Sequence, residues 1–447
     1  MPPFGAIASF LLTAVIWTSG FAQNIDSLMK QRVDAGETPG IVVGIYEAGK
    51  ITYYTCGFAN PETKEKVSQK TLFEIGSITK TFTALMTALM VQQGAWSLND
   101  PAQKYLPPEV TLPEKNGKPI TIEDLVTATS GLPRMPDNLA PADPQNPFID
   151  YTGERMVDFL THYTLTRESG STYEYSNLGM ALLGYVLVLK NHKTYSQLLD
   201  EWITKPLHMN QTFINPPDKT TQHRAQGYFE KTAVKAWTWT DGSVLASAEG
   251  LVSNSEDLMK YLLAQLNESP PLSQAIAMTH VPRHNAGDSH MQIGLGWHIL
   301  NDEIIWHGGA SGGFRSFAGF NKQTRTAVVV LTNSNTGADD LGFYLLDHSL
   351  PLKNIQMPVA PSEKTLAEFP GEYEVVPQFR ILITLKNGLL FYQASGQDSF
   401  ELAPESGTRF YVKETNVQIE FIWNEQQEVV KLILKDSEGI HYATRIN

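Results

Sequence analysis

A serine and a lysine three residues apart, Ser77 and Lys80, begin the segment of this chain with the clearest chemical pattern. Residues 73–90 read FEIGSITKTFTALMTALM, and their apolar positions recur at the spacing of an amphipathic helix. Residues three apart on a helix share a face, so we expect the hydroxyl and the amine side by side in its first turn. Burial favours a neutral lysine, which makes such a pair a nucleophile with its own base.

The Ser-x-x-Lys pattern alone is weak evidence, because the chain contains a second copy from Ser27 to Lys30. Only the Ser77 copy leads into a long apolar helix, and this context distinguishes the two. The predicted buried face of that helix comprises Phe82, Leu85, Met86, Leu89 and Met90.

Two further motifs would have to meet this pair in space. Tyr175-Ser-Asn177 directly precedes an apolar helical pattern, and His307-Gly308-Gly309 precedes two strand candidates, so His307 could lie on an edge strand of their sheet. Each motif also has an ordinary structural interpretation. Tyr175 could be a buried tyrosine with a satisfied hydroxyl, Asn177 could cap the following helix, and His307 could belong to a strand-end turn. The order and the local context of the three motifs together favour one site.

With these motifs in this order, the chain resembles the serine β-lactamase and penicillin-binding-protein superfamily, whose signature is Ser-x-x-Lys, then Tyr/Ser-x-Asn, then a Lys-Thr-Gly-like element. The Tyr-x-Asn form resembles the class C branch, which includes D-aminopeptidase-like, esterase-like and LACTB-like hydrolases. The likeness covers roughly residues 25–350. Its supporting stretches are Leu98-Asn-Asp-Pro101, Thr129-Ser-Gly-Leu132 and Gly294-Leu-Gly-Trp297.

The resemblance implies an α/β (α+β) fold, in which helices flank an antiparallel sheet and a helical subdomain carries Tyr175. It implies that Ser77 is the nucleophile and that Lys80 and Tyr175 together form the base system. Asn177 is then expected to hydrogen-bond Lys80 and the substrate amide. The backbone N–H groups of Ser77 and Ala310 are expected to form the oxyanion hole.

The third motif departs from the class C pattern, because His307 stands where lysine is usual. An ammonium group suits the carboxylate of a β-lactam, whereas an imidazole carries less charge at neutral pH. His307 is expected near Tyr175, in contact with the tyrosine hydroxyl or the polar end of the substrate. Gly308 and Gly309 are expected to leave room for substrate to lie against their strand.

The sequence therefore predicts a serine hydrolase that cleaves amide or peptide bonds through an acyl-enzyme, with a small molecule or peptide, including one with a D-residue, as substrate. The same residues also suit a carboxylesterase or a class C-like β-lactamase. A different class of protein, a penicillin-binding sensor that acylates without turnover, also fits. The sequence does not choose the substrate, since surface loops shape the binding cleft.

Composition limits the partners and the compartment. The net charge of −13 over 447 residues disfavours nucleic acid and anionic membranes as partners. Residues 4–17 are apolar and too short for a comfortable membrane span, and Gly20-Phe21-Ala22 suits a cleavage site before Gln23. The residues before the apolar stretch include no lysine or arginine, unlike those of most signal peptides. The pattern as a whole still predicts a periplasmic or secreted protein.

Cys56 is the only cysteine, so an internal disulfide and cysteine-based metal sites are not expected, and the chemistry proposed needs no cofactor and no metal. We expect Cys56 to be a small core residue on a strand. No feature of the sequence fixes the oligomeric state.

Turn signals and strand patterns divide the chain. The predicted parts are a signal peptide (1–22), a hydrolase domain (23–350), a Pro-rich linker (351–366) and an antiparallel β-barrel domain (367–447). The hydrolase domain is the β-lactamase-like part of the resemblance, and the barrel resembles the lipocalin-like C-terminal domain attached to some of these peptidases. Strands are predicted at 41–46 and 51–56, joined around Ala48-Gly49, and at 314–320 and 327–332. The strand-like runs of the tail are 379–385, 389–392, 409–412, 417–423, 429–434 and 440–445.

Overall fold

The computed structural model of the chain describes residues 25–217, 223–267, 271–287, 290–355, 362–412, 417–436 and 439–446. The predicted signal peptide, residues 1–22, lies outside the described residues. The chain forms two compact units, Met1–Lys353 and Asn354–Asn447. A search of the described residues for a helix long and apolar enough to cross a membrane finds none.

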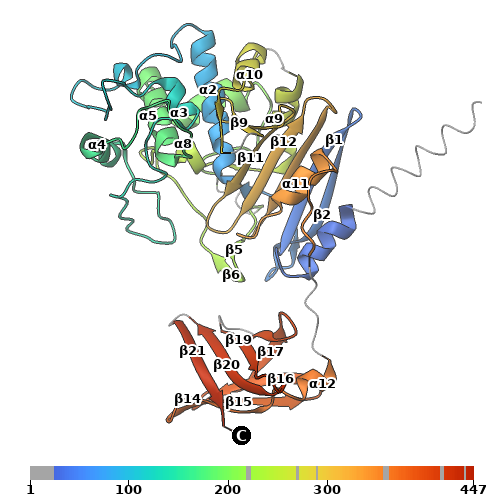
Figure 1. Ribbon diagram of the computed structural model, residues 1–447. Coiled ribbons are helices and arrows are strands. Elements are labelled where there is room, and N and C mark those ends of the chain that lie inside the picture. Colours follow the sequence, from blue (N-terminus) through green and yellow to red (C-terminus); the bar gives the residue numbers. More distant parts are fainter. Residues whose placement is uncertain are drawn as a thin grey trace, which may run out of the picture. The chain divides into compact units, whose positions relative to one another are not determined.

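The first unit is built on an antiparallel sheet, in which nine strands of the described ranges take part (Figure 1). In spatial order they are β3 (Glu65–Lys66), β2 (Lys50–Asn60), β1 (Gly40–Glu47), β13 (Thr326–Thr332), β12 (Arg315–Asn321), β11 (Ile304–Ala310), β10 (His298–Leu300), β9 (Met291–Ile293) and β8 (His284–Asn285).

The sequence accounts for the central strands. β13 reads TAVVVLT and is buried along its whole length between β1 and β12, as a nearly continuous apolar run predicts. β1 and β2 pair from Gly40↔Gly57 to Glu47↔Lys50. The two residues between them, Ala48 and Gly49, have φ angles of 49° and 83°, which suit a tight two-residue hairpin turn. The predicted hairpin is therefore confirmed. Cys56 on β2 is half-buried and packs against the smaller core, so it lies at the edge of a core and not inside it as expected.

Successive side chains of each strand point to opposite faces of the sheet, and helices cover both faces. Val42 and Val329 point into a large core shared with helix α9 (Ser255–Asn267). Val43 and Val330 point into a smaller core on the other face, shared with helix α11 (Asp339–Leu346) and the helix at residues 25–34 (Figure 1). This arrangement confirms the predicted α/β (α+β) fold.

The remaining helices gather on the side of the large core (Figure 1). They are α2 (Thr79–Gln92), α3 (Ile122–Val126), α4 (Gly153–His162), α5 (Asn177–Asn191), α6 (Tyr195–Leu199), α8 (Ala246–Glu249) and α10 (Ser273–Thr279), with 3₁₀ turns η1 (Gly76–Ile78) and η2 (Ala102–Tyr105) and a π turn η3 (Asp200–Thr204). Two short ribbons, β4 (Phe73–Glu74) with β7 (Val252–Ser253) and β5 (Gly227–Phe229) with β6 (Thr232–Val234), complete the unit.

Helix α2 is buried on every face, so the predicted amphipathic helix is wrong in one respect. Its threonines look polar in the sequence, but their hydroxyls bond to main-chain carbonyls. Thr81 Oγ1 donates to Ile78 O at 2.8 Å, and Thr83 Oγ1 donates to Ser247 O at 2.6 Å. A threonine satisfied in this way can be buried at little cost, so the helix can pass through the middle of the core.

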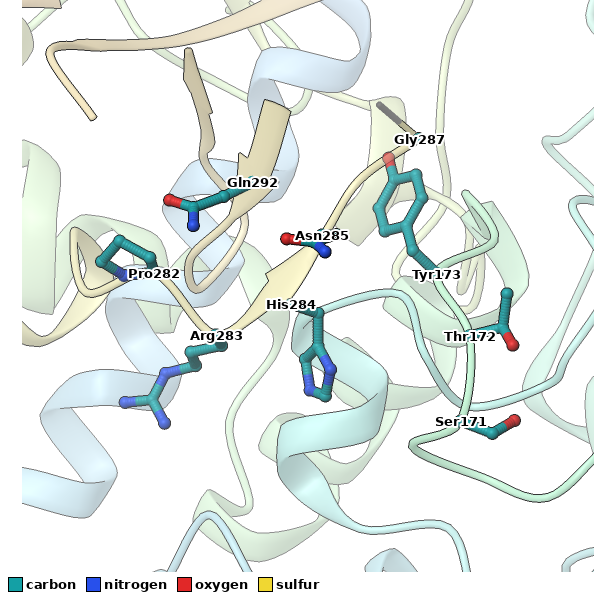
Figure 2. Close-up of a pocket in the computed structure, with 9 residues that line it drawn as sticks. All are labelled: Ser171, Thr172, Tyr173, Pro282, Arg283, His284, Asn285, Gly287 and Gln292. Carbon is teal, nitrogen blue, oxygen red and sulfur yellow. The ribbon is translucent and has the colours of Figure 1, made fainter. Parts of the chain in front are cut away.

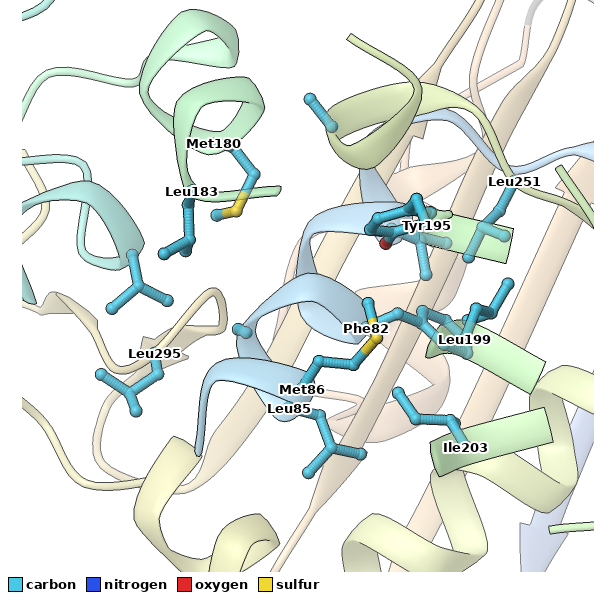
Figure 3. Close-up of a cluster of buried hydrophobic side chains, with 14 of the residues drawn as sticks. Phe82, Leu85, Met86, Met180, Leu183, Tyr195, Leu199, Ile203, Leu251 and Leu295 are labelled. Atoms are coloured by element: carbon cyan, nitrogen blue, oxygen red, sulfur yellow. The ribbon is translucent and has the colours of Figure 1, made fainter. Parts of the chain in front are cut away.

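The predicted apolar face of α2 is at the centre of that core. Figure 3 shows Phe82 and Met86 among side chains of α6, η3 and the segment before β7, with Met180 and Leu183 of α5 on another side of the helix. Phe82 also stacks on Tyr261 of α9, with ring centroids 4.0 Å apart. The lysine of the Ser-x-x-Lys motif therefore stands on a helix that is packed on all sides.

The second unit is a closed antiparallel barrel of eight strands within the described residues after 361. They are β14 (Gly371–Val376), β15 (Phe379–Lys386), β16 (Leu389–Ala394), β17 (Phe400–Pro404), β18 (Arg409–Val412), β19 (Gln418–Trp423), β20 (Val429–Asp436) and β21 (Gly439–Arg445). The predicted antiparallel barrel is confirmed, although β14 and β17 were not among the predicted runs. β14 carries two glutamates, and β17 ends on a proline, which masks their strand character.

The barrel interior is filled by its own side chains. Phe369 is fully buried there and stacks on Phe421 at 4.2 Å between centroids, with Phe410 at 5.4 Å. A short helix, α12 (Glu363–Leu366), precedes it within the stretch predicted as linker.

Candidate active site

Ser77 stands in η1, directly before α2, where backbone N–H groups lack intrahelical acceptors. The turn depends on Gly76, whose φ is +50°, a region that residues with a side chain rarely adopt. A Cβ atom on Gly76 would also lie 2.6 Å from the backbone N and O atoms of Ala310. The segment that carries Ser77 is thus pressed directly against the end of β11, which carries the third motif.

Lys80 contacts Ser77 as the sequence predicts. Its Nζ atom lies 2.9 Å from Ser77 Oγ and 3.0 Å from the carbonyl oxygen of Ala248. Both side chains are buried, with exposed fractions of 8% for Ser77 and 3% for Lys80. Burial lowers the pKa of Lys80 to about 7, while the charge of Glu249 acts to raise it and that of Arg134 to lower it. A substantial fraction of the amine is therefore neutral near pH 7.

The second Ser-x-x-Lys copy lies in a different environment. Ser27 and Lys30 are both exposed on the helix at residues 25–34, and Lys30 forms an ion pair with Asp34 at 2.5 Å. A solvated lysine paired with a carboxylate stays protonated and cannot act as a base. The two copies therefore lie in different environments, as their sequence context predicts.

Tyr175 faces the same lysine from the start of α5. Ser176 is the N-cap of that helix and accepts a hydrogen bond from Gly179 N at 2.9 Å, which leaves Tyr175 just outside the helix. The Tyr175 ring centroid is 4.9 Å from Lys80 Nζ. Burial raises the pKa of the phenol, and its hydrogen-bonding interaction with Ser77 only partly offsets this. Tyr175 is therefore a neutral phenol at physiological pH.

Asn177 is brought to the site, but its amide points to a different partner from the one expected. Its Nδ2 group donates to Glu249 Oε1 and to Met135 Sδ, the latter at 3.3 Å. Among the described contacts, the hydrogen bonds of Lys80 go to Ser77 and Ala248 instead. A buried carboxylate is a strong acceptor, which explains the orientation of the amide. The helix cap expected as an alternative role for Asn177 is supplied by Ser176.

His307 is buried on β11, with its ring centroid 6.1 Å from that of Tyr175. Its Nδ1 atom lies 2.6 Å from Gly308 O, and because a carbonyl only accepts, Nδ1 carries the proton of the neutral ring. Burial holds the pKa of His307 well below its usual range. His307 thus contributes a neutral imidazole to the site.

The position of β11 corrects the expectation of an edge strand. Three short strands, β10, β9 and β8, continue the sheet beyond it, and His298 on β10 pairs with Trp306 of β11. These strands are two or three residues long, and such short runs carry little sequence signal.

Gly309 has a packing role that the sequence did not suggest. A Cβ atom there would lie 2.0 Å from Ile75 O, so the glycine allows β11 to pack against the segment before Ser77. At Gly308, in contrast, the nearest atoms to an added Cβ are at 3.7 Å.

His298 is a neighbour that the sequence did not identify. Its ring stacks near-parallel to Tyr175 with centroids 6.4 Å apart, and lies 5.1 Å from that of His307. Burial lowers the pKa of His298 to about 4, and its Nε2 atom is 2.9 Å from the hydroxyl of Tyr173. It directly follows the Gly294–Trp297 stretch, which is the only signal in the sequence that marks it.

Glu249 and Arg134 were also missed. Glu249 is buried at the end of α8, and the Cζ atom of Arg134 lies 5.0 Å from the centroid of the Tyr175 ring. Neither belongs to a motif, although Arg134 follows the Thr129–Leu132 stretch closely.

A polar pocket of about 600 Å³ has Tyr173 among its lining residues (Figure 2). Tyr173, His284, Asn285 and Gln292 line it with Arg283, which pairs with Glu123 at 2.7 Å. Tyr173 connects this pocket to the site through its hydrogen bond with His298. The pocket therefore offers polar groups close to the clustered motifs.

Taken together, the structure gathers Ser77, Lys80, Tyr175, Asn177 and His307 in one place, and it places Ala310 against Gly76. Comparison with known proteins identifies the family. The family model described as Beta-lactamase matches residues 25–347. The chain belongs to the beta-lactamase family. A second model, described as a domain of unknown function (DUF3471), matches residues 356–444, which include the barrel strands except the last residue of β21.

Relatives with printed names agree with this membership. The chain is 28% identical over 373 residues to a protein named Beta-lactamase from Escherichia coli strain K12, which covers 74% of this chain and 94% of that one. It is 27% identical over 385 residues to Protein flp from Staphylococcus aureus strain N315. This match covers 83% of this chain and 73% of Protein flp. The crystal structure of a Beta-Lactamase/D-Alanine Carboxypeptidase from Pseudomonas syringae has the same fold, with 22% sequence identity and a TM-score of 0.64. The match covers 74% of this chain and 100% of that chain. The chain is accordingly a serine hydrolase of the beta-lactamase type.

Proposed function

We propose that this member of the beta-lactamase family is an exported hydrolase that cleaves amide or peptide bonds through an acyl-enzyme on Ser77. One observation carries the proposal: a buried lysine with a pKa of about 7 contacts the Ser77 hydroxyl at 2.9 Å. A serine hydroxyl is a weak nucleophile unless a base takes its proton as it attacks. Lys80 is such a base, already in place.

In the acylation step, the neutral amine of Lys80 accepts the Ser77 proton while Oγ attacks the substrate carbonyl carbon. Tyr175 is a phenol at neutral pH, so we assign it the proton transfer to the departing nitrogen or oxygen rather than the initial proton abstraction. Lys80 then returns a proton to Tyr175. The bond to the leaving group breaks, and the acyl group stays on Ser77.

The negative charge on the carbonyl oxygen needs donors. We assign them to the backbone N–H groups of Ser77 and Ala310, and the packing of Ala310 against Gly76 supports this pairing. Each such donor contributes on the order of 3 kcal/mol to transition-state stabilisation.

Deacylation requires a water molecule activated by the same base system, Lys80 with Tyr175. A protein that performs only the first step would be a penicillin-binding sensor, which is the alternative from a different class. The two differ in stoichiometry: an enzyme turns over, whereas a sensor releases one leaving group for each protein molecule.

Substrate contacts are assigned to Asn177, His307, Gly308 and Gly309. Because His307 is neutral, this wall of the site supplies no permanent charge for a substrate carboxylate, which favours amides, peptides or esters over β-lactams. Substrates with a D-residue are included where that residue supplies the acyl group, as in D-Ala-p-nitroanilide, because such a substrate has no carboxylate beside the scissile bond. Carboxylesterase and class C-like β-lactamase activity are the alternatives that use the same groups.

The proposed cellular setting rests on the N-terminal sequence. The apolar stretch at residues 4–17 supports export to the periplasm or beyond the cell, with cleavage before Gln23. The barrel is assigned no catalytic residue. Its filled core supports a separate recognition or stabilising module.

A panel of three chromogenic substrates tests the proposal: a p-nitrophenyl ester, D-Ala-p-nitroanilide and nitrocefin. We expect multiple turnovers of the anilide, which Ser77→Ala abolishes. Turnover of the ester alone would establish the carboxylesterase, and of nitrocefin alone the β-lactamase. A burst of one product per protein molecule, with no turnover afterwards, would identify a sensor.

A further inference from the structure

Glu249 is a buried carboxylate that the proposed mechanism does not use. It is the last residue of α8, with 8% of its surface exposed. Its Oε1 atom accepts a hydrogen bond from Asn177 Nδ2, and the carbonyl oxygen of the preceding residue, Ala248, accepts one from Lys80 Nζ. Two adjacent residues of one short helix therefore hold two side chains of the site.

The position of α8 leaves little freedom for Glu249 to move. A Cβ atom on Gly184 of α5 would lie 2.1 Å from Ser247 Oγ, so α5 and α8 are in close contact. A Cβ atom on Gly250 would lie 2.7 Å from Ala246 O, so there is no room for a side chain where the chain leaves the helix. Close packing of this kind holds a side chain in one orientation.

The charged and titratable groups around Glu249 come from several elements. Burial raises the pKa of Glu249, while the charges of Lys80 of α2 and Arg134 of the loop before α4 and the hydrogen bond from Asn177 act to lower it. Tyr175 also interacts with the Glu249 charge, and it is neutral. The two histidines near Lys80, His298 and His307, are also neutral, because burial lowers their pKa.

We propose that Glu249 is a positioning residue of this site, which orients the Asn177 amide and places a negative charge near the Lys80 amine. This inference rests on the proposed function, since it assigns Lys80 the role of base. Glu249 Oε1 accepts the hydrogen bond from Asn177 Nδ2, so it holds the amide with Nδ2 toward α8 and Oδ1 away from it. Asn177 Oδ1 is buried without a partner in the described residues, as expected of a group held by its other end.

The charge of Glu249 also sets the pH at which Lys80 becomes a base. A nearby anion stabilises the ammonium form, so removing it lowers the pKa of Lys80. Glu249→Gln keeps a side-chain oxygen for Asn177 but removes the charge. In this variant a larger fraction of Lys80 is neutral at a given pH, and the rise of activity with pH moves to lower pH.

The test is the rate at which a fluorophosphonate probe labels Ser77 in the full chain, measured from about pH 5 to pH 9. For E249Q we expect the inflection to move down by about one pH unit. The labelling rate at the high-pH plateau should change less than about threefold, since the acceptor is kept. Glu256→Gln, on α9, is the matched control: it removes the same charge from the same unit and should leave the inflection in place.

A second variant separates orientation from charge. Glu249→Asp retains the charge but shortens the side chain, so Asn177 loses its partner while Lys80 keeps a nearby anion. Here we expect an inflection within about 0.3 unit of wild type and a plateau at least about tenfold lower. If E249Q does not fold, E249D still tests the proposal, because a wild-type plateau in E249D would overturn the role of Glu249 in orientation.

The outcomes distinguish this inference from the proposed function. If wild-type Ser77 is not labelled, the proposed function itself fails. If wild type is labelled with an inflection near pH 7 and E249Q shows the same inflection, Lys80 is the base but Glu249 does not tune it. A uniform loss of rate in E249Q with a lower melting temperature and no shift would show that Glu249 is only structural.

Discussion

The Nζ atom of Lys80 lies 2.9 Å from the Oγ atom of Ser77, with both side chains buried at the start of a helix that is packed on every side. The burial of helix α2 determines the protonation of the Lys80 amine. Because α2 passes through the core, the lysine is desolvated, and because it is desolvated, its amine is available as a base near neutral pH.

The first prediction is the pH dependence of kcat/KM for an uncharged ester. Burial lowers the pKa of Lys80 to about 7, and only the neutral amine can accept the serine proton. Below this pH the ammonium form accumulates, so kcat/KM should fall about tenfold for each pH unit. Above it, kcat/KM should level off. A profile without an inflection between about pH 6 and pH 8 would contradict the assignment of Lys80 as base.

Tyr175→Phe provides the companion measurement. The phenol is proposed to deliver a proton to the leaving group, so its loss should lower the plateau by about 10²-fold or more. The inflection should persist, because Lys80 is retained. Tyr185→Phe, a partly buried tyrosine of α5, is a control for loss of a hydroxyl. A Tyr175→Phe enzyme with near wild-type kcat at every pH would remove Tyr175 from the mechanism.

His307→Lys should change substrate preference. The imidazole is neutral, so an ammonium in its place adds a charge that a substrate carboxylate can use. We expect the ratio of kcat/KM for nitrocefin to that for a neutral p-nitrophenyl ester to rise about tenfold. His307→Gln, which adds no charge, should not raise it. Parallel changes for both substrates in His307→Lys would exclude His307 from substrate selection.

Two neighbouring glycines should respond differently to alanine. A Cβ atom on Gly309 would lie 2.0 Å from Ile75 O and 2.3 Å from Ser316 Oγ, whereas one on Gly308 would meet nothing closer than 3.7 Å. Gly309→Ala should therefore lower the free energy of unfolding by about 2 kcal/mol or more, and Gly308→Ala by under about 1 kcal/mol. Denaturant unfolding of both variants measures this. Equal effects would mean that β11 is not packed against Ile75 as described.

The barrel should be dispensable for acylation. The residues of the candidate site all belong to the unit Met1–Lys353, and the barrel has a filled core of its own. A protein that ends at residue 355 should fold and be labelled by a fluorophosphonate probe at Ser77, although its relative rates on different substrates can change. A folded truncated protein that takes up no label would show that the barrel builds part of the site.

What the sequence predicts well in this chain is local. Ser77 and Lys80 are close because residues three apart share a helix face, and the Ala48-Gly49 turn is readable from two residues. The burial of α2 could not be read in the same way, since whether Thr83 is exposed depends on Ser247 O, which is distant in the chain. Hydrogen-bonding threonines and exposed ones look alike in a sequence.

The residues that the sequence missed belong to long-range contacts. Asn177 and Glu249 are separated by 72 positions, and Lys80 and Ala248 by 168, so no spacing rule connects them. His298 lies on a three-residue strand, too short to show periodicity. The family resemblance supplied the order of the motifs, but Glu249 and His298 lie outside those motifs.

The most direct test of the account is to locate the covalent adduct. The full-length protein is incubated with a fluorophosphonate probe or a penicillin, digested, and analysed by peptide mass spectrometry. We predict one added mass on the peptide that contains Ser77, absent in Ser77→Ala and strongly reduced in Lys80→Ala. Labelling that survives intact in Ser77→Ala, or an adduct on another residue, would contradict the claim that Ser77 is the nucleophile.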